Sequence, residues 1–248
     1  MARNENRQAP DTWQLGSTEL NSRLMLAIPE TAELDNLGAV LEAGAIESAT
    51  IKVGTDLGAA APDAFTILRD HGVHILPNTV DAADAADAVR AAHHGAALVG
   101  RPWVKLILTQ DSQYNVPNPR QLLQAAEELV GEGFEVFPLV PDDPGLAVEL
   151  ARIGCAGLMP QGSPAGSGQG IANPLKFQLI LDRVDVPVLA GAGIGTAADA
   201  CQALETGCAG VASAKVIFSA RDQVQAARAL ASAVAAGREA WRAAPPRT

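Results

Sequence analysis

Cysteine, aromatic side chains and long apolar runs are all scarce in this sequence. Its 248 residues include only three cysteines, Cys155, Cys201 and Cys208, and these form no Cys-x-x-Cys pair. They are too few for a disulfide framework, which is typical of a reducing compartment, and we interpret them as small buried residues. No stretch approaches the roughly 18 uninterrupted apolar residues of a membrane span, and the first ten residues lack the apolar core of a signal peptide. We expect a soluble, cytoplasmic protein with no membrane partner.

Basic residues are also in the minority. The chain has 28 acidic and 18 basic residues, and the basic ones form neither a block nor a face interleaved with aromatic side chains, which make up 4% of the sequence. This pattern argues against nucleic acid as a partner. We interpret the pair His93-His94 as a helix end, and we expect no metal site and no cofactor.

Short apolar runs are what the sequence has in abundance, and each is followed by a helical pattern. Their alternation with helices predicts a parallel sheet. Eight such units, spaced by about 25 residues, favour a single (β/α)8 barrel, with an open doubly wound sheet as the alternative. The eight runs are residues 23–28, 48–53, 73–76, 103–108, 134–139, 156–159, 186–190 and 209–213.

Helices are indicated between the runs. Residues 81–92 and 118–130 carry apolar side chains at i, i+3 and i+4, as one face of a helix requires. Asn118-Pro119 and Asp143-Pro144 each combine a capping residue with proline at the first helical position, and Gly133 and Gly154 follow predicted helix ends.

The ends of the chain lie outside the repeated pattern. Residues 13–20 predict a small hairpin that plugs the barrel floor, ahead of the first strand. We expect residues 1–12 to be a disordered tail, residues 13–240 to form the barrel, and residues 241–248 to form a second tail.

Three glycine-rich loops follow the last three predicted strands. They are residues 162–171, 190–195 and 213–216, and their convergence at one end of the barrel predicts a phosphate cradle. The glycines at 191, 193 and 195 do not have the Gly-x-Gly-x-x-Gly spacing of a dinucleotide site. Lys215, just past the eighth strand, can add charge to the cradle or be solvated.

A lysine sits in the middle of the fourth apolar run. Because side chains alternate across a strand, Trp103, Lys105 and Ile107 share one face, and the aliphatic residues between and after them share the other. Lys105 then points into the barrel, where a desolvated amine can form a Schiff base, or its head group reaches water or a carboxylate at the mouth. Lys52, near the end of the second run, is either a rival amine or a phosphate contact.

Several segments together resemble bacterial thiazole synthase, the enzyme that builds the thiazole ring of thiamin. They are Ile75-Leu-Pro-Asn-Thr79, Trp103-Val-Lys-Leu106, Glu132-Gly-Phe-Glu-Val-Phe-Pro138, Met159-Pro-Gln-Gly-Ser-Pro-Ala-Gly-Ser-Gly-Gln-Gly-Ile-Ala-Asn-Pro174 and Ala192-Gly-Ile-Gly195. The resemblance spans roughly residues 13–240 and implies a (β/α)8 barrel whose strand-four lysine, here Lys105, forms an imine with a sugar phosphate. It also implies a partner, a small ubiquitin-like sulfur carrier protein whose C-terminal thiocarboxylate supplies the sulfur.

The resemblance also implies substrate-binding positions. The phosphate contacts fall on Gly166, Ala192, Gly193, Ala214 and Lys215. To the same predicted substrate-binding set we add the following residues: Gly168, Asn78 and Lys52.

The sequence departs from the family pattern at positions that matter for chemistry. Ile107 stands where the family has an inward glutamate, and Gly191 where it has an aspartate before Ala-Gly-Ile-Gly. Ala214-Lys215 replaces an asparagine-threonine pair, and Gly54-Thr55 replaces two arginines. The nucleophile and the cradle are retained, whereas two acid–base groups are absent.

These departures make a 2-thiosugar synthase of an antibiotic pathway, forming 2-thioglucose 6-phosphate from glucose 6-phosphate, our first prediction. The alternatives are a thiamin thiazole synthase acting on 1-deoxy-D-xylulose 5-phosphate, and an inactive barrel that only binds a sulfur carrier protein. Lys52, Asp56, His74 and Asp111 are candidates for moving protons. Apolar helix faces such as that of residues 223–235 favour a homo-oligomer.

Overall fold

Eight parallel strands form a closed barrel at the centre of the molecule. The computed structural model describes residues 11–53, 61–111 and 116–244. In this part of the chain the strand order is β10-β9-β6-β5-β4-β3-β12-β11, and the bridges Leu158–Val188 and Gln161–Ala192 join the chain at β10 to the chain at β11. The (β/α)8 prediction is therefore confirmed over the open sheet. The strands are β3 (Leu24–Ile28), β4 (Ser48–Lys52), β5 (His74–Asn78), β6 (Trp103–Leu106), β9 (Glu135–Val140), β10 (Met159–Pro160), β11 (Leu189–Ala190) and β12 (Gly210–Ser213).

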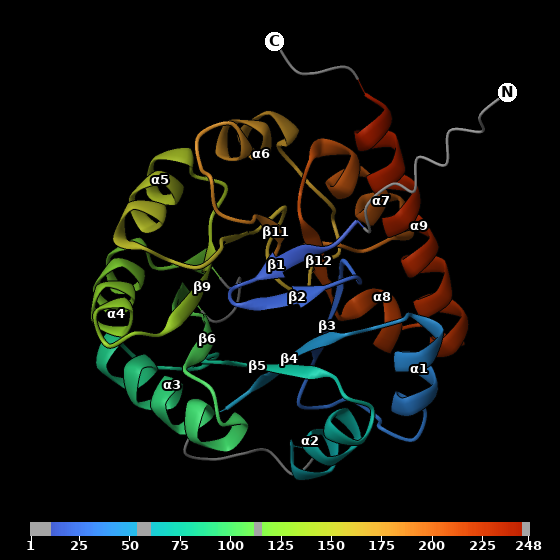
Figure 1. Cartoon of the computed structure of the whole chain (residues 1–248), viewed down its shortest axis with the longest axis horizontal. Helices are drawn as coiled ribbons and strands as arrows, with labels where there is room; N and C mark the ends of the chain where they lie inside the picture. The colour runs from blue at the N-terminus through green and yellow to red at the C-terminus, as the bar shows by residue number, and fades with distance from the viewer. Residues whose placement is uncertain (1–10, 54–60, 112–115, 245–248) are drawn as a thin grey trace, which may run out of the picture.

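Helices surround the barrel as an outer ring (Figure 1). A helix follows each strand of the barrel, and two follow β12. α9 continues to Ala243, beyond the barrel end that the sequence predicts at residue 240, while residues 1–10 and 245–248, most of the two predicted tails, lie outside the described residues. The helices are α1 (Leu37–Ala43), α2 (Ala61–Asp70), α3 (Ala85–Val99), α4 (Pro119–Gly131), α5 (Pro144–Ile153), α6 (Pro174–Leu181), α7 (Ala197–Thr206), α8 (Lys215–Phe218) and α9 (Gln223–Ala243).

Helix caps lie where the sequence predicts them. The Asn118 side chain accepts a hydrogen bond from the Gln121 N–H, and that of Asp143 accepts from the Gly145 and Leu146 N–H groups. Each cap satisfies backbone donors that a first helical turn leaves free, which stabilises a helix by about 1 kcal/mol.

Helix α3 begins later and ends later than its apolar spacing predicts. Asp81 has φ +71°, which is incompatible with a right-handed helix, so the helix begins after the cap residue Asp84. It continues through Gly95, where a Cβ atom would lie 2.6 Å from the Cβ of Pro77 and 2.8 Å from a methyl group of Val53. Glycine at this position lets the helix pack directly on the barrel.

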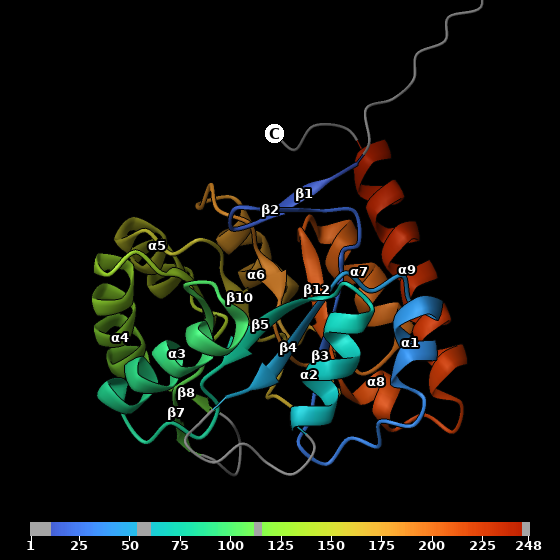
Figure 2. The ribbon, with the colours of Figure 1, turned by 60° about the horizontal axis from the view of Figure 1, so that its bottom comes forward.

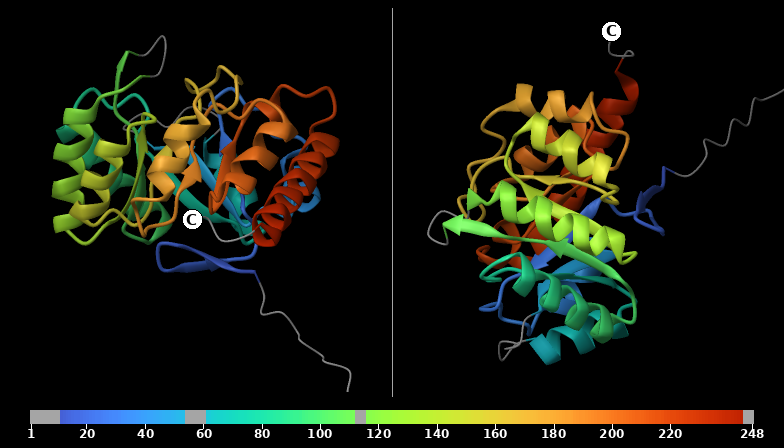
Figure 3. Two further views of the ribbon diagram at one scale, coloured as in Figure 1. Left: turned by 90° about the horizontal axis from the view of Figure 1, so that it is seen from above. Right: turned by 90° about the vertical axis from the view of Figure 1, so that its left-hand side faces the viewer.

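A hairpin closes one end of the barrel, as predicted. β1 (Trp13–Leu15) pairs antiparallel with β2 (Thr18–Leu20), and Trp13, Leu15 and Leu20 are buried in the same cluster as Trp103 and Phe137 of the barrel interior. Figure 3 shows the hairpin lying across this end.

Polar contacts hold the tip of the hairpin against the barrel. Arg101 donates to Glu135 at 2.6 Å and to the Ser17 hydroxyl at 2.7 Å, and the Ser17 N–H donates to Glu135 at 2.7 Å. We call the end of the barrel that the hairpin closes the floor.

A short antiparallel ribbon, which the sequence did not predict, extends from the other end. It consists of β7 (Thr109–Asp111) and β8 (Val116–Pro117), between β6 and α4. Figure 2 shows the ribbon and the hairpin at opposite ends of the barrel. The ribbon follows the carboxyl end of β6, so it marks the mouth, where active sites of this fold lie.

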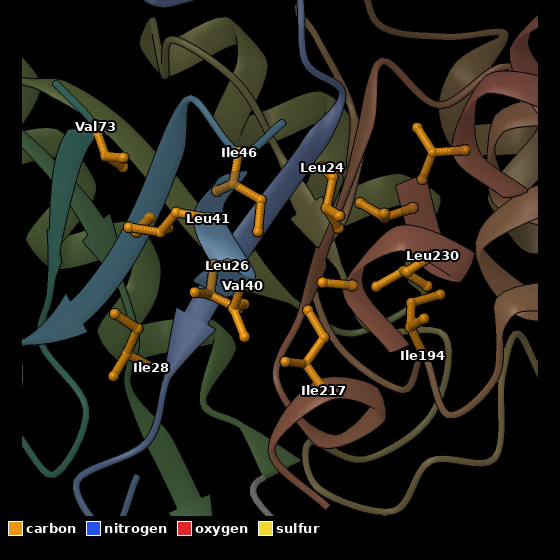
Figure 4. Close-up of a cluster of buried hydrophobic side chains, with 14 of the residues drawn as sticks. Leu24, Leu26, Ile28, Val40, Leu41, Ile46, Val73, Ile194, Ile217 and Leu230 are labelled. Carbon is orange, nitrogen blue, oxygen red and sulfur yellow. The ribbon is translucent and has the colours of Figure 1, made fainter. Parts of the chain in front are cut away.

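Apolar side chains fill two layers, one inside the barrel and one between strands and helices. Leu24, Leu26 and Ile28 of β3 pack in the outer layer with Val40 and Leu41 of α1 (Figure 4). Burial of each such side chain stabilises the fold by roughly 1.5–3 kcal/mol. No helix in the described part of the chain has the length and apolar character needed to span a membrane.

Candidate active site

Lys105 lies inside the barrel, on the strand that the sequence assigns to it. Its neighbours Trp103 and Ile107 belong to the interior cluster, whereas Val104 and Leu106 belong to the outer one, so the predicted alternation is confirmed. Only 5% of the Lys105 surface is exposed. Lys105 is therefore a core lysine with little access to water.

The amine of Lys105 has few hydrogen-bond partners in the described part of the chain. Among these residues, Nζ donates one long hydrogen bond of 3.5 Å to the carbonyl oxygen of Gly191, which follows β11 on another wall of the barrel. Burial lowers the pKa of Lys105 from 10.5 to about 8. Near pH 8 about half of the side chains are then neutral amines, the form that attacks a carbonyl carbon.

Lys52 is the opposite kind of lysine. Its ammonium group forms ion pairs with Glu30 at 2.6 Å and Asp81 at 2.7 Å, near the ends of neighbouring strands. Hydrogen bonds from Lys52 to Asp81 and Glu30 raise its pKa above the ordinary value. These contacts favour a charged group at the rim of the mouth and disfavour Lys52 as a rival nucleophile.

Asn78 lies between the two lysines. Its Cα pairs with that of Lys52 on β4 and with that of Lys105 on β6. The buried amide donates to Thr50 Oγ1 at 3.2 Å and accepts the Val80 N–H at 3.2 Å. Asn78 thus lies in register with Lys52 and Lys105, at the carboxyl ends of β4, β5 and β6.

The predicted phosphate loops pack against one another. The Gly170 N–H donates to the Gly193 carbonyl at 2.8 Å, and Lys215 Nζ donates to the carbonyls of Gly166 and Ser167, each at 3.0 Å. A Cβ on Gly195 would overlap the backbone of Gly168. Close backbone packing explains the density of glycine in these loops.

Several backbone donors in these loops are available to a ligand. Among the hydrogen bonds of the described residues, the N–H groups of Gly193, Ala214 and Lys215 donate to no acceptor. Backbone N–H groups without an acceptor, close to a lysine ammonium, are typical of anion-binding sites.

A pocket of about 550 Å³ brings part of the predicted set together. Gly166, Ala214 and Lys215 line it, with residues of the β3–α1 connection and of the chain after α8. The other predicted residues are not in its lining: Lys105, Asn78, Lys52, Gly168, Ala192 and Gly193. The structure therefore brings three of the predicted residues to one pocket, whose lining also includes Glu33, and leaves the buried Lys105 outside that lining.

The two departures from the family pattern leave Lys105 in apolar surroundings. A Cβ atom on Gly191 would lie 2.6 Å from the carbonyl oxygen of Met159 and 2.9 Å from a methyl group of Leu139, so no side chain fits there without rearrangement. Ile107, on the same face of β6 as the lysine, packs in the interior cluster. Neither position carries a side chain that can take up or release a proton.

Of the remaining candidates for proton transfer, only His74 has a described side chain, and it does not lie at the mouth. His74 begins β5 and is exposed at the floor end of that strand, four residues before Asn78. Asp56 and the side chain of Asp111 lie outside the described residues. Within the described ranges, no three His, Cys, Asp or Glu side chains are grouped so as to hold a metal ion.

The cysteines take no part in the site. Cys155 and Cys208 are buried, and Cys201 is partly exposed. Burial raises the pKa of Cys155 to about 12, so its thiol stays protonated and unreactive.

A second pocket, of about 470 Å³, lies at the floor end and contains no predicted residue. Asp11 joins Arg23 at 3.0 Å and Arg238 at 2.8 Å there. Hydrogen bonds from Arg238 and then Arg23 hold the pKa of Asp11 near 2. This ion pair network ties α9 to the segment before the hairpin.

Comparison with protein families and curated proteins gives consistent matches. The family model described as "Thiazole biosynthesis protein ThiG" matches residues 14–248. The chain is 37% identical over 229 residues to thiazole synthase of Shewanella amazonensis, covering 92% of this chain and 84% of that protein. It is 38% identical over 235 residues to thiazole synthase of Chromobacterium violaceum, covering 93% and 89%.

Solved structures add one informative neighbour. A chain in the crystal structure of the Amycolatopsis orientalis BexX/CysO complex is 26% identical, with a TM-score of 0.85 over 95% of this chain and 97% of that one. Thiamine phosphate pyrophosphorylase from Pyrococcus furiosus, 17% identical with a TM-score of 0.60 over 87% and 96%, is similar in fold alone. The names of the relatives support the thiazole alternative better than the predicted hexose reaction, which none of these matches tests.

Proposed function

Because the chain belongs to the thiazole synthase family, we propose that it is a sulfur-transfer enzyme whose Lys105 holds a phosphorylated ketose as an imine. The observation that carries this proposal is the buried amine of Lys105, whose pKa is lowered to about 8 inside the barrel. A neutral amine attacks the ketone carbon, water leaves, and the resulting iminium carbon is more electrophilic than the ketone. A sulfur nucleophile then adds to the activated substrate.

The loops at the mouth are proposed to hold the phosphate group. The unused N–H groups of Gly193, Ala214 and Lys215, with the Lys215 ammonium, would donate to its oxygens. Gly166, Gly168 and Ala192 would keep the backbone close enough for these contacts. Asn78 and Lys52 would contact the sugar from the opposite side of the mouth.

The sulfur donor is proposed to be a small ubiquitin-like sulfur carrier protein. Support comes from the family resemblance and from the similar BexX chain, which was solved in a complex with CysO. We also propose that the chain is a homo-oligomer in the cytoplasm.

Formation of the thiamin thiazole from 1-deoxy-D-xylulose 5-phosphate is the reaction that the relatives favour. Both curated relatives described above are named thiazole synthase and are matched over more than nine tenths of this chain.

Formation of a 2-thiosugar phosphate from a hexose phosphate is the second candidate, and a specific observation favours it. Gly191 has no room for a carboxylate and Ile107 is apolar, so the surroundings of Lys105 lack two groups suited to the many proton transfers of ring closure. Addition of sulfur to an imine carbon needs fewer of them.

Borohydride trapping separates these possibilities. The protein is incubated with 1-deoxy-D-xylulose 5-phosphate or with glucose 6-phosphate, reduced, and digested for mass spectrometry. A pentulose adduct on Lys105 supports thiazole synthesis, and a hexose adduct supports the thiosugar reaction. No adduct with either sugar would reject both and leave a barrel that only binds a carrier. An unchanged adduct in Lys105→Ala would reject Lys105 as the nucleophile.

A further inference from the structure

The hydroxyl group of Thr79 takes the place of a peptide group beside Lys105. It donates to the Ile107 carbonyl at 2.8 Å and accepts the Ile107 N–H at 2.9 Å, while the Thr79 N–H donates to the Lys105 carbonyl at 3.3 Å. Thr79 is fully buried. The residue directly after β5 thus makes three hydrogen bonds to the backbone around Lys105.

The turn after β5 explains why a side chain is needed here. In a parallel ladder, the Thr79 carbonyl would accept the Ile107 N–H. That carbonyl instead accepts the Ala82 N–H at 3.1 Å, closing a turn with Asp81 at φ +71°. The pairing between β5 and β6 accordingly ends at Asn78 and Lys105. The Thr79 hydroxyl replaces the Thr79 carbonyl as acceptor of the Ile107 N–H, and it also donates to the Ile107 carbonyl.

We propose that Thr79 is a positioning residue for Lys105, which holds the carboxyl end of β6 in place so that the amine points into the barrel. Directly after Leu106, the backbone is also held by a 2.8 Å hydrogen bond from the Asn118 N–H to the Leu108 carbonyl. Without the hydroxyl, both polar groups of the Ile107 backbone would be buried and unpaired, and the segment would move to reach water. The role in catalysis rests on the proposed function, because it requires the Lys105 amine to react.

The test compares Thr79→Val, which keeps the shape but removes the hydroxyl, with Thr79→Ser, which keeps the hydroxyl. Ser48→Ala is the matched control, because the Ser48 hydroxyl is fully buried and has no hydrogen-bond partner among the described residues. We expect the rate of borohydride trapping at saturating ketose phosphate to fall about 10- to 100-fold in Thr79→Val, since small misplacements of a reacting group have effects of this size. Thr79→Ser and Ser48→Ala should stay within about threefold of the parent.

A second measurement needs no substrate. Trace acetylation with acetic anhydride, followed across pH by mass spectrometry, reports the titration of Lys105 in the free protein. In Thr79→Val we expect the Lys105 midpoint to move upward, because the loosened strand admits water. Should Thr79→Val not fold, Thr79→Ala removes the same hydroxyl and takes its place.

The two measurements separate this proposal from the proposed function. Folded Thr79→Val with the parent's trapping rate and Lys105 titration would overturn the positioning role. If the parent forms no adduct with either 1-deoxy-D-xylulose 5-phosphate or glucose 6-phosphate, the proposed function fails, and the acetylation profile alone decides: an altered profile supports positioning and an unchanged one rejects it.

Discussion

Replacing Lys105 by methionine should stabilise the protein near neutral pH, although most substitutions of core residues destabilise. Burial lowers the pKa of Lys105 from 10.5 to about 8, so the folded state bears a penalty for the charged form. At about 1.4 kcal/mol for each pKa unit, this penalty is about 3 kcal/mol. Methionine has a similar length and no charge, so Lys105→Met should recover most of that free energy of unfolding.

The stability difference between Lys105→Met and the parent should depend on pH. Below pH 8, Lys105 is protonated in both states and the penalty is fully present. Between about pH 8 and 10.5, the folded protein binds fewer protons than the unfolded chain, so the stability of the parent rises relative to the variant. The advantage of Lys105→Met should therefore shrink across this window and vanish above it.

Urea unfolding of the parent and of Lys105→Met at pH 7 and at pH 10 measures the effect. Lys52→Met is the matched control: it also removes a lysine at the mouth, but one whose pKa is raised by Asp81 and Glu30, so its loss should not stabilise. A Lys105→Met variant less stable than the parent by the same amount at both pH values would refute the reasoning.

Further predictions concern the mouth and the wall behind Lys105. Lys215→Ala should raise the inhibition constant of inorganic phosphate about 10-fold, in line with the loss of a charge-assisted hydrogen bond, while leaving the rate of imine trapping at saturating substrate within about threefold of the parent; an unchanged constant, measured by competition, would exclude Lys215 from the anion site. Gly191→Ala should lower the free energy of unfolding by about 1–3 kcal/mol, since its Cβ would lie 2.6 Å from the Met159 carbonyl oxygen, and a neutral effect in urea unfolding would show that this wall relaxes freely.

The barrel was predictable because its signals are local and repeated. The alternation of side chains along a strand predicted from the sequence that Lys105 points into the barrel. The structure confirms it, because Trp103 and Ile107, on the same face of the strand, are buried in the interior cluster. Glycines in the late loops were likewise visible in the sequence, because backbone packing as close as that of Gly195 against Gly168 leaves no room for a side chain.

Contacts between distant loops were not predictable. The ion pairs of Lys52 depend on Glu30, in the connection after β3, and on Asp81. The position of Asp81 follows from a positive φ that aspartate adopts only infrequently. The hydroxyl of Thr79 reached Ile107 because the turn after β5 removed a carbonyl from the ladder. Neither arrangement has a signature in spacing or composition.

The central claim is that Lys105 reacts as a neutral amine formed by burial. Its most direct measurement is the rate of borohydride-trapped adduct formation on the Lys105 peptide between pH 6 and pH 9, with the preferred ketose phosphate at saturation. The account predicts an adduct on Lys105 whose rate of formation rises with a midpoint near pH 8. An adduct on Lys52 instead, or no adduct on Lys105 at any pH in the folded protein, would contradict it.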